Sequence, residues 1–333
     1  MSLRKAKGVY GRIAYGVWDL LSRAAGRPLP GDPAGSIIET APPVSSFRRS
    51  ALPNPAPLSL AQRRRFHSAV GRLAALARRT VRRHLARGVT KRLKADQSYV
   101  TDADLAIERA LRRAIARAFP GHGIVGEEFP PLRLDSPFQW ILDPIDGTLS
   151  FIHGIPFFGT LIALHYRGRP VAAAIDQPAL DLRYTAGLGL GAFRNGRRIR
   201  LRDLGRGEAL EREVIATAER YRFARCGQAA RFDRLQRTHP LVRSYADCLG
   251  HTLAAEGAVG AMVDYGVRLW DIAATELLVT EAGGRWVETY RRPRPPRAAV
   301  YGVIFGKPKV VQWLLPFFAA GGRPQREAFD GHG

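Results

Sequence analysis

The chain has 333 residues, 46% of them hydrophobic, which is enough for one large domain or two ordinary domains with a substantial core. This composition excludes a wholly disordered chain, and the presence of only two cysteines, Cys226 and Cys248, excludes a disulfide-stapled miniprotein. No apolar run approaches the roughly 20 residues of a membrane span, and no signal-peptide core follows the N-terminus. The sequence therefore predicts a cytoplasmic protein without a membrane span.

The net charge of +23 is unusual, because 52 lysine and arginine residues face only 29 aspartate and glutamate residues. Such an excess is typical of proteins that bind nucleic acid, an acidic membrane surface or phosphorylated substrates. Residues 59–95 alone contain twelve basic residues and no acidic one. More than half of the excess therefore belongs to one short segment, and charge alone does not select among these partners.

Residues 1–58 are interpreted as a basic, proline-rich extension. Apolar residues at helical spacing predict a short amphipathic helix near residues 8–25, and the Pro, Ser and Gly content of residues 28–57 predicts a linker. Both a targeting peptide and a tail without a core of its own agree with this composition. We expect the folded part of the chain to begin at residue 59.

Two helices are predicted next. Between residues 60 and 87 apolar side chains recur every three to four positions, and Gly88 can end the helix. A second helix is predicted over residues 103–118, with Thr101 or Asp102 as its N-cap.

From residue 123 onward the pattern changes to short apolar runs that are typical of strands, first at 123–126 and 138–142. A meander is predicted over residues 158–201, which include a tight Asn195-Gly196 turn. Beyond residue 213 the two kinds of element alternate, with strands expected at 214–218, 261–264 and 300–305 and helices at 247–257, 271–282 and 309–318.

The few acidic residues gather in four motifs, each at the end of a predicted strand or the start of a predicted helix. The motifs are Thr101-Asp-Ala-Asp104 with Glu108, Gly126-Glu-Glu128, Asp143-Pro-Ile-Asp-Gly-Thr148 and Trp270-Asp271. A carboxylate just beyond a buried strand lies at the edge of the core, where a binding site can form. Converging carboxylates without Cys or His nearby favour a hard cation, Mg²⁺ before Zn²⁺.

Gly147 and Thr148 add an anion-binding feature to this acidic set. They begin a turn or short helix, and the backbone N–H groups at a helix start bind phosphate. Mg²⁺ held by carboxylates beside such a turn indicates phosphoryl chemistry. Any one of the acids is equally well explained as a helix cap or a surface charge, but four groups together favour a site.

These motifs resemble those of the inositol monophosphatase family of Mg²⁺-dependent, lithium-sensitive phosphatases. The matching segments are V-T-D-A-D-L-A-I-E at 100–108, G-E-E at 126–128, W-I-L-D-P-I-D-G-T at 140–148 and W-D-I-A-A-T-E-L-L-V-T-E-A-G-G at 270–284. The resemblance implies an α+β fold, a layered αβαβα sandwich of the inositol monophosphatase/fructose-1,6-bisphosphatase type. The phosphatase domain is expected over residues 59–320, with halves at 59–205 and 206–320, and a flexible tail at 321–333.

The resemblance also implies a role for individual residues. Metal ligands are expected at Glu127, Asp143, Asp146, Asp271 and the backbone carbonyl of Ile145. Asp104 and Thr148 match the pair that orients and helps to deprotonate the attacking water, and Glu127 belongs to the same catalytic set. The phosphate is expected on Asp146, Gly147 and Thr148. The implied cofactor is two or three Mg²⁺ ions, which activate water and stabilise the leaving alkoxide.

Within the family, D-G-T-L-S-F-I-H-G-I-P-F-F-G-T-L-I-A-L at 146–164 and D-C-L-G-H at 247–251 are most similar to the histidinol-phosphatase-like branch. Leu149 and His251 depart from that branch, in which a basic and an aromatic residue are common at these positions. The implied substrate is a small phosphorylated metabolite such as histidinol phosphate. Inositol 1-phosphate and 3′-phosphoadenosine 5′-phosphate are alternatives.

Substrate contacts are expected from Ser150, Asp247 and Asp264. Asp264 matches the substrate-contacting acid of the inositol enzymes, and a carboxylate there suits either sugar hydroxyls or the ammonium of histidinol phosphate. A homodimer is expected only because homodimers are common in the family.

A protein of another class, which binds nucleic acid or a membrane surface through the helix at 60–87, would explain the charge. It would leave the four acidic motifs unexplained, and the sequence has no recognisable nucleic-acid motif and no run of aromatic residues for base stacking. We therefore expect no specific nucleic-acid partner.

Overall fold

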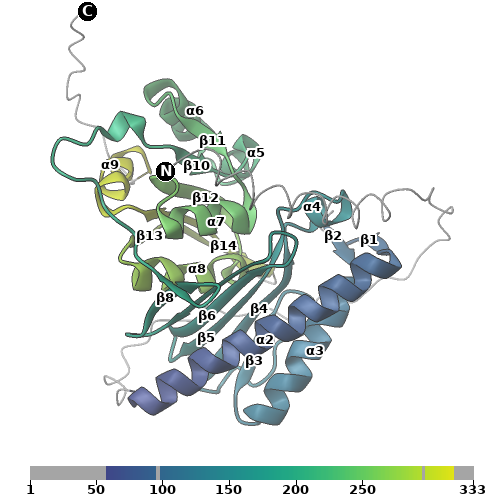
Figure 1. The fold of residues 1–333 in the computed structure, drawn as a ribbon. Helices are drawn as coiled ribbons and strands as arrows, with labels where there is room; N and C mark the ends of the chain where they lie inside the picture. Colours follow the sequence, from purple (N-terminus) through teal and green to yellow (C-terminus); the bar gives the residue numbers. More distant parts are fainter. Residues whose placement is uncertain (1–57, 95–97, 295–296, 319–333) are drawn as a thin grey trace, which may run out of the picture.

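The computed structural model describes residues 58–94, 98–294 and 297–318 (Figure 1). The helix expected near residues 8–25, the linker that follows it and the tail at 321–333 lie outside these ranges. Within them the chain forms alternating helical and sheet layers, which confirms the predicted αβαβα sandwich.

The described helices are α2 (Leu60–Arg87), α3 (Asp102–Ala118), α4 (Thr148–Ile152), α5 (Arg220–Arg225), α6 (Ala229–Thr238), α7 (Asp247–Glu256), α8 (Leu269–Ala282) and α9 (Pro308–Phe318), with a 3₁₀ turn η1 (Leu210–Arg212). A seven-stranded sheet of the described residues has the order β3-β4-β5-β6-β7-β8-β9, and only β3 and β4 pair in parallel. Its strands are β3 (Gly123–Gly126), β4 (Phe138–Asp146), β5 (Gly159–Tyr166), β6 (Arg169–Gln177), β7 (Leu182–Gly187), β8 (Gly191–Arg194) and β9 (Arg197–Ile199).

A five-stranded sheet from the C-terminal half of the described chain has the order β11-β10-β12-β14-β13. Its strands are β10 (Ile215–Thr217), β11 (Val242–Ser244), β12 (Ala261–Val267), β13 (Arg285–Arg294) and β14 (Arg297–Gly306). A small antiparallel pair, β1 (Lys91–Leu93) and β2 (Tyr99–Thr101), lies between α2 and α3 in the chain.

The first helical layer covers one face of the seven-stranded sheet. Helix α2 begins at a capping box in which Ser59 and Gln62 satisfy each other's backbone N–H groups. Its apolar stripe and that of α3 pack on the sheet, as Figure 1 shows for the two helices lying side by side. Strand β4 is buried on both faces, because Trp140 and Leu142 join this core while Ile141 joins the next one.

Helices α7 and α8 form the middle layer between the two sheets. Helix α8 is apolar around most of its circumference, with Ile272, Leu277 and Leu278 buried, because both of its sides face a sheet. Helices α5, α6 and α9 cover the outer face of the five-stranded sheet, where Phe223 and Phe318 pack around Tyr265.

The structure contains every element predicted within the described residues, and Thr101 rather than Asp102 is the N-cap of α3. It also contains elements that were not predicted, namely β1, β2, η1, α5, α6, β11 and β13. Strand β13 holds four arginines and a proline, which obscure its alternation, and β1 is fully exposed. Pairing with a neighbouring strand, rather than local pattern, stabilises both.

Arg78 ties α2 to the far strands of the seven-stranded sheet. Its Nε donates to both carboxylate oxygens of Asp176, at 2.9 and 3.2 Å, and its Nη2 donates to the carbonyl of Leu182 at 2.8 Å. Asp176 is buried and receives a second guanidinium from Arg183 at 2.6 Å. Removing Arg78 would leave the buried carboxylate of Asp176 with Arg183 as its remaining cation, and weakening a buried ion pair in this way is destabilising.

Replacing Arg78 by alanine is therefore expected to lower the free energy of unfolding by about 3 kcal/mol. The measurement is urea denaturation at pH 7, and Arg79→Ala serves as the matched control because Arg79 is the next residue of the same helix and is exposed. The control should change stability by less than about 0.5 kcal/mol. Equal losses in the two variants would contradict a structural role for the Asp176 contact.

Candidate active site

The four acidic motifs meet where β4 ends and where α3, α7 and α8 begin. Their proximity is visible in their electrostatics: burial, followed by repulsion from Glu127, Asp146 and Asp271, raises the pKa of Asp143 well above its usual range. The fold thus brings together acids from both halves of the domain, although more than 160 positions separate Asp104 from Asp271 in the sequence.

The first turn of α3 supplies Asp104. Its Oδ2 accepts hydrogen bonds from the N–H of Thr101 at 2.8 Å and from the Thr101 hydroxyl at 2.5 Å, so the carboxylate closes a capping box. Its Oδ1 is buried and has no hydrogen-bond partner. Burial raises the pKa of Asp104 to about 6, although the bonds from Thr101 act in the opposite direction.

The Gly126-Glu127-Glu128 segment is fixed by the second acid of α3. Glu108 is buried and accepts from the N–H of Glu128 at 2.8 Å and from Arg112 Nε at 2.8 Å. A Cβ at Gly126 would lie 2.0 Å from Glu108 Oε1, so only glycine fits there. The motif therefore combines a tight backbone approach with two adjacent carboxylates.

Lys94, which the sequence reasoning did not single out, bridges these two carboxylates. Its Nζ donates to Glu127 Oε1 at 2.9 Å and to Glu128 Oε1 at 2.7 Å. Burial lowers the pKa of Lys94, but the two glutamates outweigh burial and raise it above its ordinary value. Burial and then Glu127 raise the pKa of Glu128 to about 8. Lys94 lies in a basic stretch of the sequence, and its sequence neighbours do not indicate that it bridges two glutamates.

The end of β4 carries Asp143 and Asp146 on either side of an irregularity in its pairing with β5. The Pro144 carbonyl between them accepts the Thr160 hydroxyl at 2.7 Å, which anchors the turn. Asp143 is 2% exposed, and its Oδ1 has no hydrogen-bond partner. The Ile145 carbonyl accepts the Thr148 hydroxyl at 3.0 Å. The Thr148 hydroxyl is thus held by this carbonyl, while Asp104, the other member of the expected water-activating pair, bonds to Thr101.

Gly147 makes the turn from β4 into α4. Its φ of 81° lies in the left-handed region, and a Cβ there would be 2.8 Å from the Phe157 carbonyl and 3.5 Å from Asp247 Oδ2. Glycine therefore permits the Phe157 carbonyl to lie close to this turn, and Asp247 of α7 lies beside the same turn. The first N–H groups of a helix have no intrahelical acceptor, so this turn suits an anion. Ser150 lies in α4 and is partly exposed.

Helix starts in the C-terminal half hold the remaining acids. The N–H of Cys248 in α7 donates to Asp146 Oδ2 at 2.5 Å, and the N–H of Arg268 donates to Asp271 Oδ2 at 2.7 Å. Such N–H groups stabilise carboxylates at helix N-termini. Burial and then repulsion from Glu127 nevertheless raise the pKa of Asp271 to about 7.

Arg222 of α5 is a second cation at the site that the sequence did not reveal. Its Nη2 donates to Asp247 Oδ1 at 2.9 Å, and its positive charge also acts on Asp146 and Asp271. Asp247 has a φ of 57°, which is unusual for a residue other than glycine. The ion pair therefore helps to hold Asp247 in a strained backbone conformation beside Gly147.

Asp264, an expected substrate contact, is wholly buried. Its Oδ2 lies 2.9 Å from His251 Nε2, and His251 Nδ1 lies 2.8 Å from the Thr275 hydroxyl. Its Oδ1 has no hydrogen-bond partner. Asp264 therefore lies beneath the acidic site and not on its surface.

The donor set fits a hard cation. Asp104, Asp143 and Asp264 each have a buried carboxylate oxygen without a partner, and oxygen ligands of this kind suit Mg²⁺. Within the described ranges, however, no three His, Cys, Asp or Glu side chains already converge as metal ligands. Lys94 and the backbone N–H groups hold several of the carboxylates instead.

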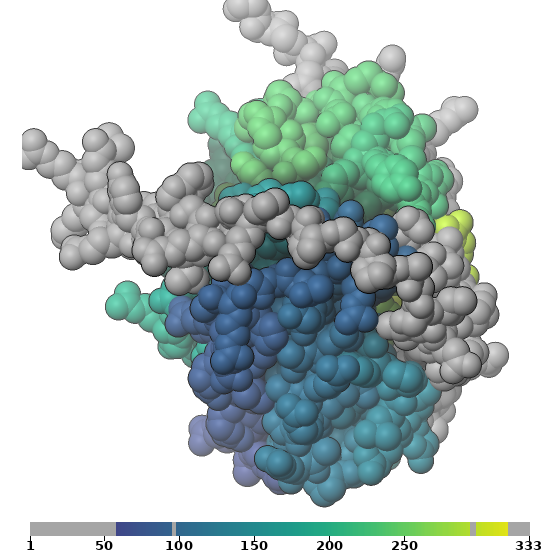
Figure 2. Space-filling view, turned by 90° about the vertical axis from the view of Figure 1, so that its right-hand side faces the viewer, coloured from purple at the N-terminus to yellow at the C-terminus, as the bar shows by residue number. Residues whose placement is uncertain are grey.

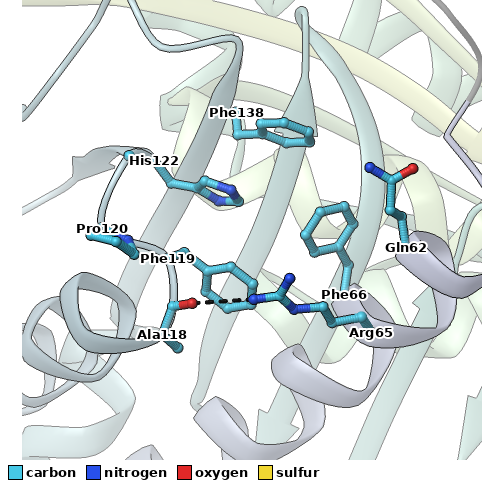
Figure 3. Close-up of a pocket in the computed structure, with 9 residues that line it drawn as sticks. Gln62, Arg65, Phe66, Ala118, Phe119, Pro120, His122 and Phe138 are labelled. Carbon is cyan, nitrogen blue, oxygen red and sulfur yellow. Dashed lines mark hydrogen bonds between the residues drawn. The ribbon is translucent and has the colours of Figure 1, made fainter.

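The hollow shown in Figure 3 is separate from this site. It has a volume of about 280 Å³ and is lined by the aromatic rings of Phe66, Phe119, His122 and Phe138, with Arg65 donating to the Ala118 carbonyl at 3.4 Å. It lies at the C-terminal end of α3, about 20 Å along the helix from Asp104. The acids, and not this hollow, are therefore the candidate site.

Comparison with known proteins agrees with the fold and the motifs. The sequence matches the inositol monophosphatase family over residues 62–315, so the chain belongs to this family and is a phosphatase of it. The histidinol-phosphatase of Mycobacterium tuberculosis is 40% identical over 58% of this chain and 75% of that protein. The inositol-1-monophosphatase of Rhizobium meliloti is 36% identical over 58% of this chain and 73% of that protein.

Solved structures lead to the same family. The extragenic suppressor protein suhB of Bartonella henselae superposes with a TM-score of 0.66 at 29% identity, covering 76% of this chain and 98% of that chain. An inositol monophosphatase from Zymomonas mobilis gives a TM-score of 0.65 at 30% identity, covering 78% and 99%. In the part of the chain that the structure describes, no helix has the length and apolar character needed to cross a bilayer.

The raised pKa of Asp271 predicts how the metal-free protein responds to pH. Its pKa is about 7 in the folded protein against an ordinary 3.8, so the folded state binds the proton more tightly and loses stability as the pH rises between these values. Asp271→Asn removes the charge and keeps a capping oxygen. With EDTA at pH 8, this variant should be more stable than wild type by up to about 4 kcal/mol, and at pH 4 the difference should largely vanish.

The measurement is urea unfolding at both pH values, with Asp135→Asn as a control because Asp135 is exposed. A variant less stable than wild type at pH 8 would show that the Asp271 carboxylate is not under repulsion.

Proposed function

We propose that this chain is a Mg²⁺-dependent phosphomonoesterase that acts on a small substrate of the histidinol phosphate type. The observation that carries the proposal is the cluster of buried, mutually repelling carboxylates beside the Gly147 turn. Burial, and after it repulsion between neighbouring carboxylates, raises the pKa values of Asp143, Asp146 and Asp271, and a divalent cation would offset both effects. A phosphate group, which binds Mg²⁺ and helix N–H groups alike, suits the same place.

The proposed ligands are those expected from the sequence: Glu127, Asp143, Asp146, Asp271 and the Ile145 carbonyl. When bound, two or three Mg²⁺ ions would polarise the phosphate and a water molecule and stabilise the leaving oxygen. Sensitivity to lithium belongs to the same proposal.

The chain's own groups have distinct tasks in this proposal. Asp104, whose pKa burial raises to about 6, is suited to accept a proton from the attacking water near neutral pH. Thr148 orients that water, and Gly147 and Thr148 donate N–H groups to the phosphate, which Asp146 helps to place. Lys94 offsets part of the negative charge of Glu127 and Glu128 until the site binds its cations.

The substrate class rests on Asp247 and on the relatives. Asp247 is partly exposed beside the Gly147 turn, so its carboxylate suits an ammonium group attached to the phosphorylated molecule. Ser150 in α4 is a second contact. Asp264 is buried and contacts His251. In this arrangement it would influence the substrate only through His251. Relatives named histidinol-phosphatase are among the most similar, at 40% and 39% identity.

Two alternatives within the family are an inositol-1-phosphatase and a 3′-phosphoadenosine 5′-phosphate phosphatase. The inositol-1-monophosphatase relative at 36% identity supports the first. Assembly as a homodimer is part of the proposal and rests on family likeness alone.

Asp146→Asn tests the class of chemistry. The variant keeps the shape of the side chain and loses the charge that holds cations and phosphate, so kcat/KM for phosphate release with Mg²⁺ should fall by at least about 1,000-fold. Asp135→Asn, an exposed acid outside the site, is the matched control and should stay within about twofold of wild type. Comparable activity in wild type and Asp146→Asn would contradict the proposed Mg²⁺-dependent phosphatase chemistry.

A substrate panel tests the finer proposal. We expect L-histidinol phosphate to have a kcat/KM at least about tenfold above those of inositol 1-phosphate, 3′-phosphoadenosine 5′-phosphate and fructose 1,6-bisphosphate, a difference of about 1.4 kcal/mol in transition-state binding. Asp247→Asn should reduce this preference, because it removes the proposed partner of the ammonium group. A preference for inositol 1-phosphate that survives Asp247→Asn would instead favour the first alternative.

A further inference from the structure

The outer faces of α2 and α3 form an exposed surface that the proposed chemistry does not use. We call it the basic face and define it by seven exposed arginines: Arg64, Arg72, Arg79, Arg83, Arg109, Arg113 and Arg117. Figure 2 shows the two helices, coloured purple to blue, lying side by side across the lower part of the molecule. Arg64 and Arg83 are 19 residues apart in one helix, so the α2 row spans about 28 Å.

Within residues 58–94, 98–294 and 297–318, no acidic side chain forms an ion pair with the arginines of this face. Helix α2 has no Asp or Glu, and the acids of α3 are confined to its first two turns, where Asp104 and Glu108 are buried. None of the seven arginines has an acidic partner among the described residues, whereas Arg78 and Arg82 of the same helix pair with Asp181. Like charges one turn apart, such as Arg79 and Arg83, disfavour the helix. Repulsion between these arginines therefore destabilises the helices, and no ion pair among the described residues offsets it.

The segments outside the described ranges are basic overall and have no excess of negative charge to offer this face. Residues 1–57 contain eight basic and three acidic residues, residues 95–97 contain one acidic residue, and residues 319–333 contain two of each. A second copy of the chain would present the same sign of charge at a symmetric contact and would be repelled. The counter-charge therefore belongs to a different molecule.

The side chains around the arginines decide which polyanion fits. A helix that lies on a membrane inserts large apolar residues beside its basic ones, but the apolar stripes of α2 and α3 are buried on the sheet, and their only large exposed apolar residue is Leu60 in the first turn of α2. Neither outer face has an exposed aromatic ring on which single-stranded bases could stack. Guanidinium groups in a long row match regularly spaced phosphates.

We propose that the basic face binds the phosphate backbone of a nucleic-acid duplex without sequence preference. The arginines would contact phosphates only, a mode of binding that carries no sequence information. Asp104 and Glu108 lie on the buried side of α3, so the duplex and a small phosphorylated substrate occupy different places. This proposal does not depend on the proposed function.

The test is binding of the full chain to a fluorescein-labelled 20-base-pair DNA duplex of arbitrary sequence, followed by anisotropy from 50 to 200 mM NaCl. The face variant replaces Arg64, Arg72, Arg79 and Arg83 by glutamine, which keeps helix propensity and removes four charges. Each lost phosphate contact lowers the slope of log K against log salt by about 0.9. We expect a slope shallower by about 3.6 and an affinity at least about tenfold weaker at 100 mM NaCl.

The control variant removes the same charge elsewhere, by replacing with glutamine four exposed arginines that belong to neither helix: Arg197, Arg200, Arg212 and Arg243. Its slope should stay within about one unit of wild type. Equal weakening in the two variants would show attraction by net charge alone and would overturn the basic face as a site. Circular dichroism confirms that both variants are folded.

Further measurements distinguish this proposal from sequence-specific binding, from membrane binding and from a change in phosphatase activity. A DNA duplex of scrambled sequence should bind with the same affinity as the first duplex. The affinity for an RNA duplex of the same length shows which type of duplex the basic face prefers. Tighter binding to phosphatidylglycerol vesicles than to the duplex, lost in the face variant, would assign the surface to a membrane and contradict the proposal. Phosphate release by the face variant should match wild type; inactivity of both proteins would count against the proposed function and leave the binding result unaffected.

Discussion

Carboxylates that repel one another are held together at the end of β4, because the surrounding fold fixes several of them through a separate backbone contact. The N–H of Cys248 holds Asp146, the N–H of Arg268 holds Asp271, and the Thr101 N–H and hydroxyl hold Asp104. Packing between two sheets and three helical layers supplies the stability that this repulsion removes.

The two halves of the domain complete the site together. The N-terminal half contributes Lys94 with the two glutamates that it bridges, and the C-terminal half contributes Arg222 with Asp247. Each cation offsets part of the negative charge, yet buried carboxylate oxygens such as Asp143 Oδ1 still lack partners. This remaining imbalance is what a divalent cation would satisfy, and it links the fold directly to the proposed phosphatase chemistry.

Much of this arrangement could be predicted from the sequence, because strong local signals mark it. The apolar periodicity of residues 60–87 predicts the long helix α2. The acidic motifs at 101–108, 126–128 and 143–148 indicate the family and, with it, the fold. Lys94 and Arg222 could not be found in this way, since each is one basic residue in an arginine-rich chain and acquires its role only through tertiary contacts.

The central claim is that the carboxylates around Asp143 hold divalent cations. The most direct measurement is an anomalous difference map from a crystal of the protein soaked in Mn²⁺, which takes Mg²⁺ sites and scatters anomalously. We expect anomalous peaks within about 2.5 Å of carboxylate oxygens of Glu127, Asp143 and Asp146. Lys94 should then be displaced from Glu127. A map without peaks at these carboxylates, with Lys94 still bonded to Glu127 and Glu128, would contradict this claim.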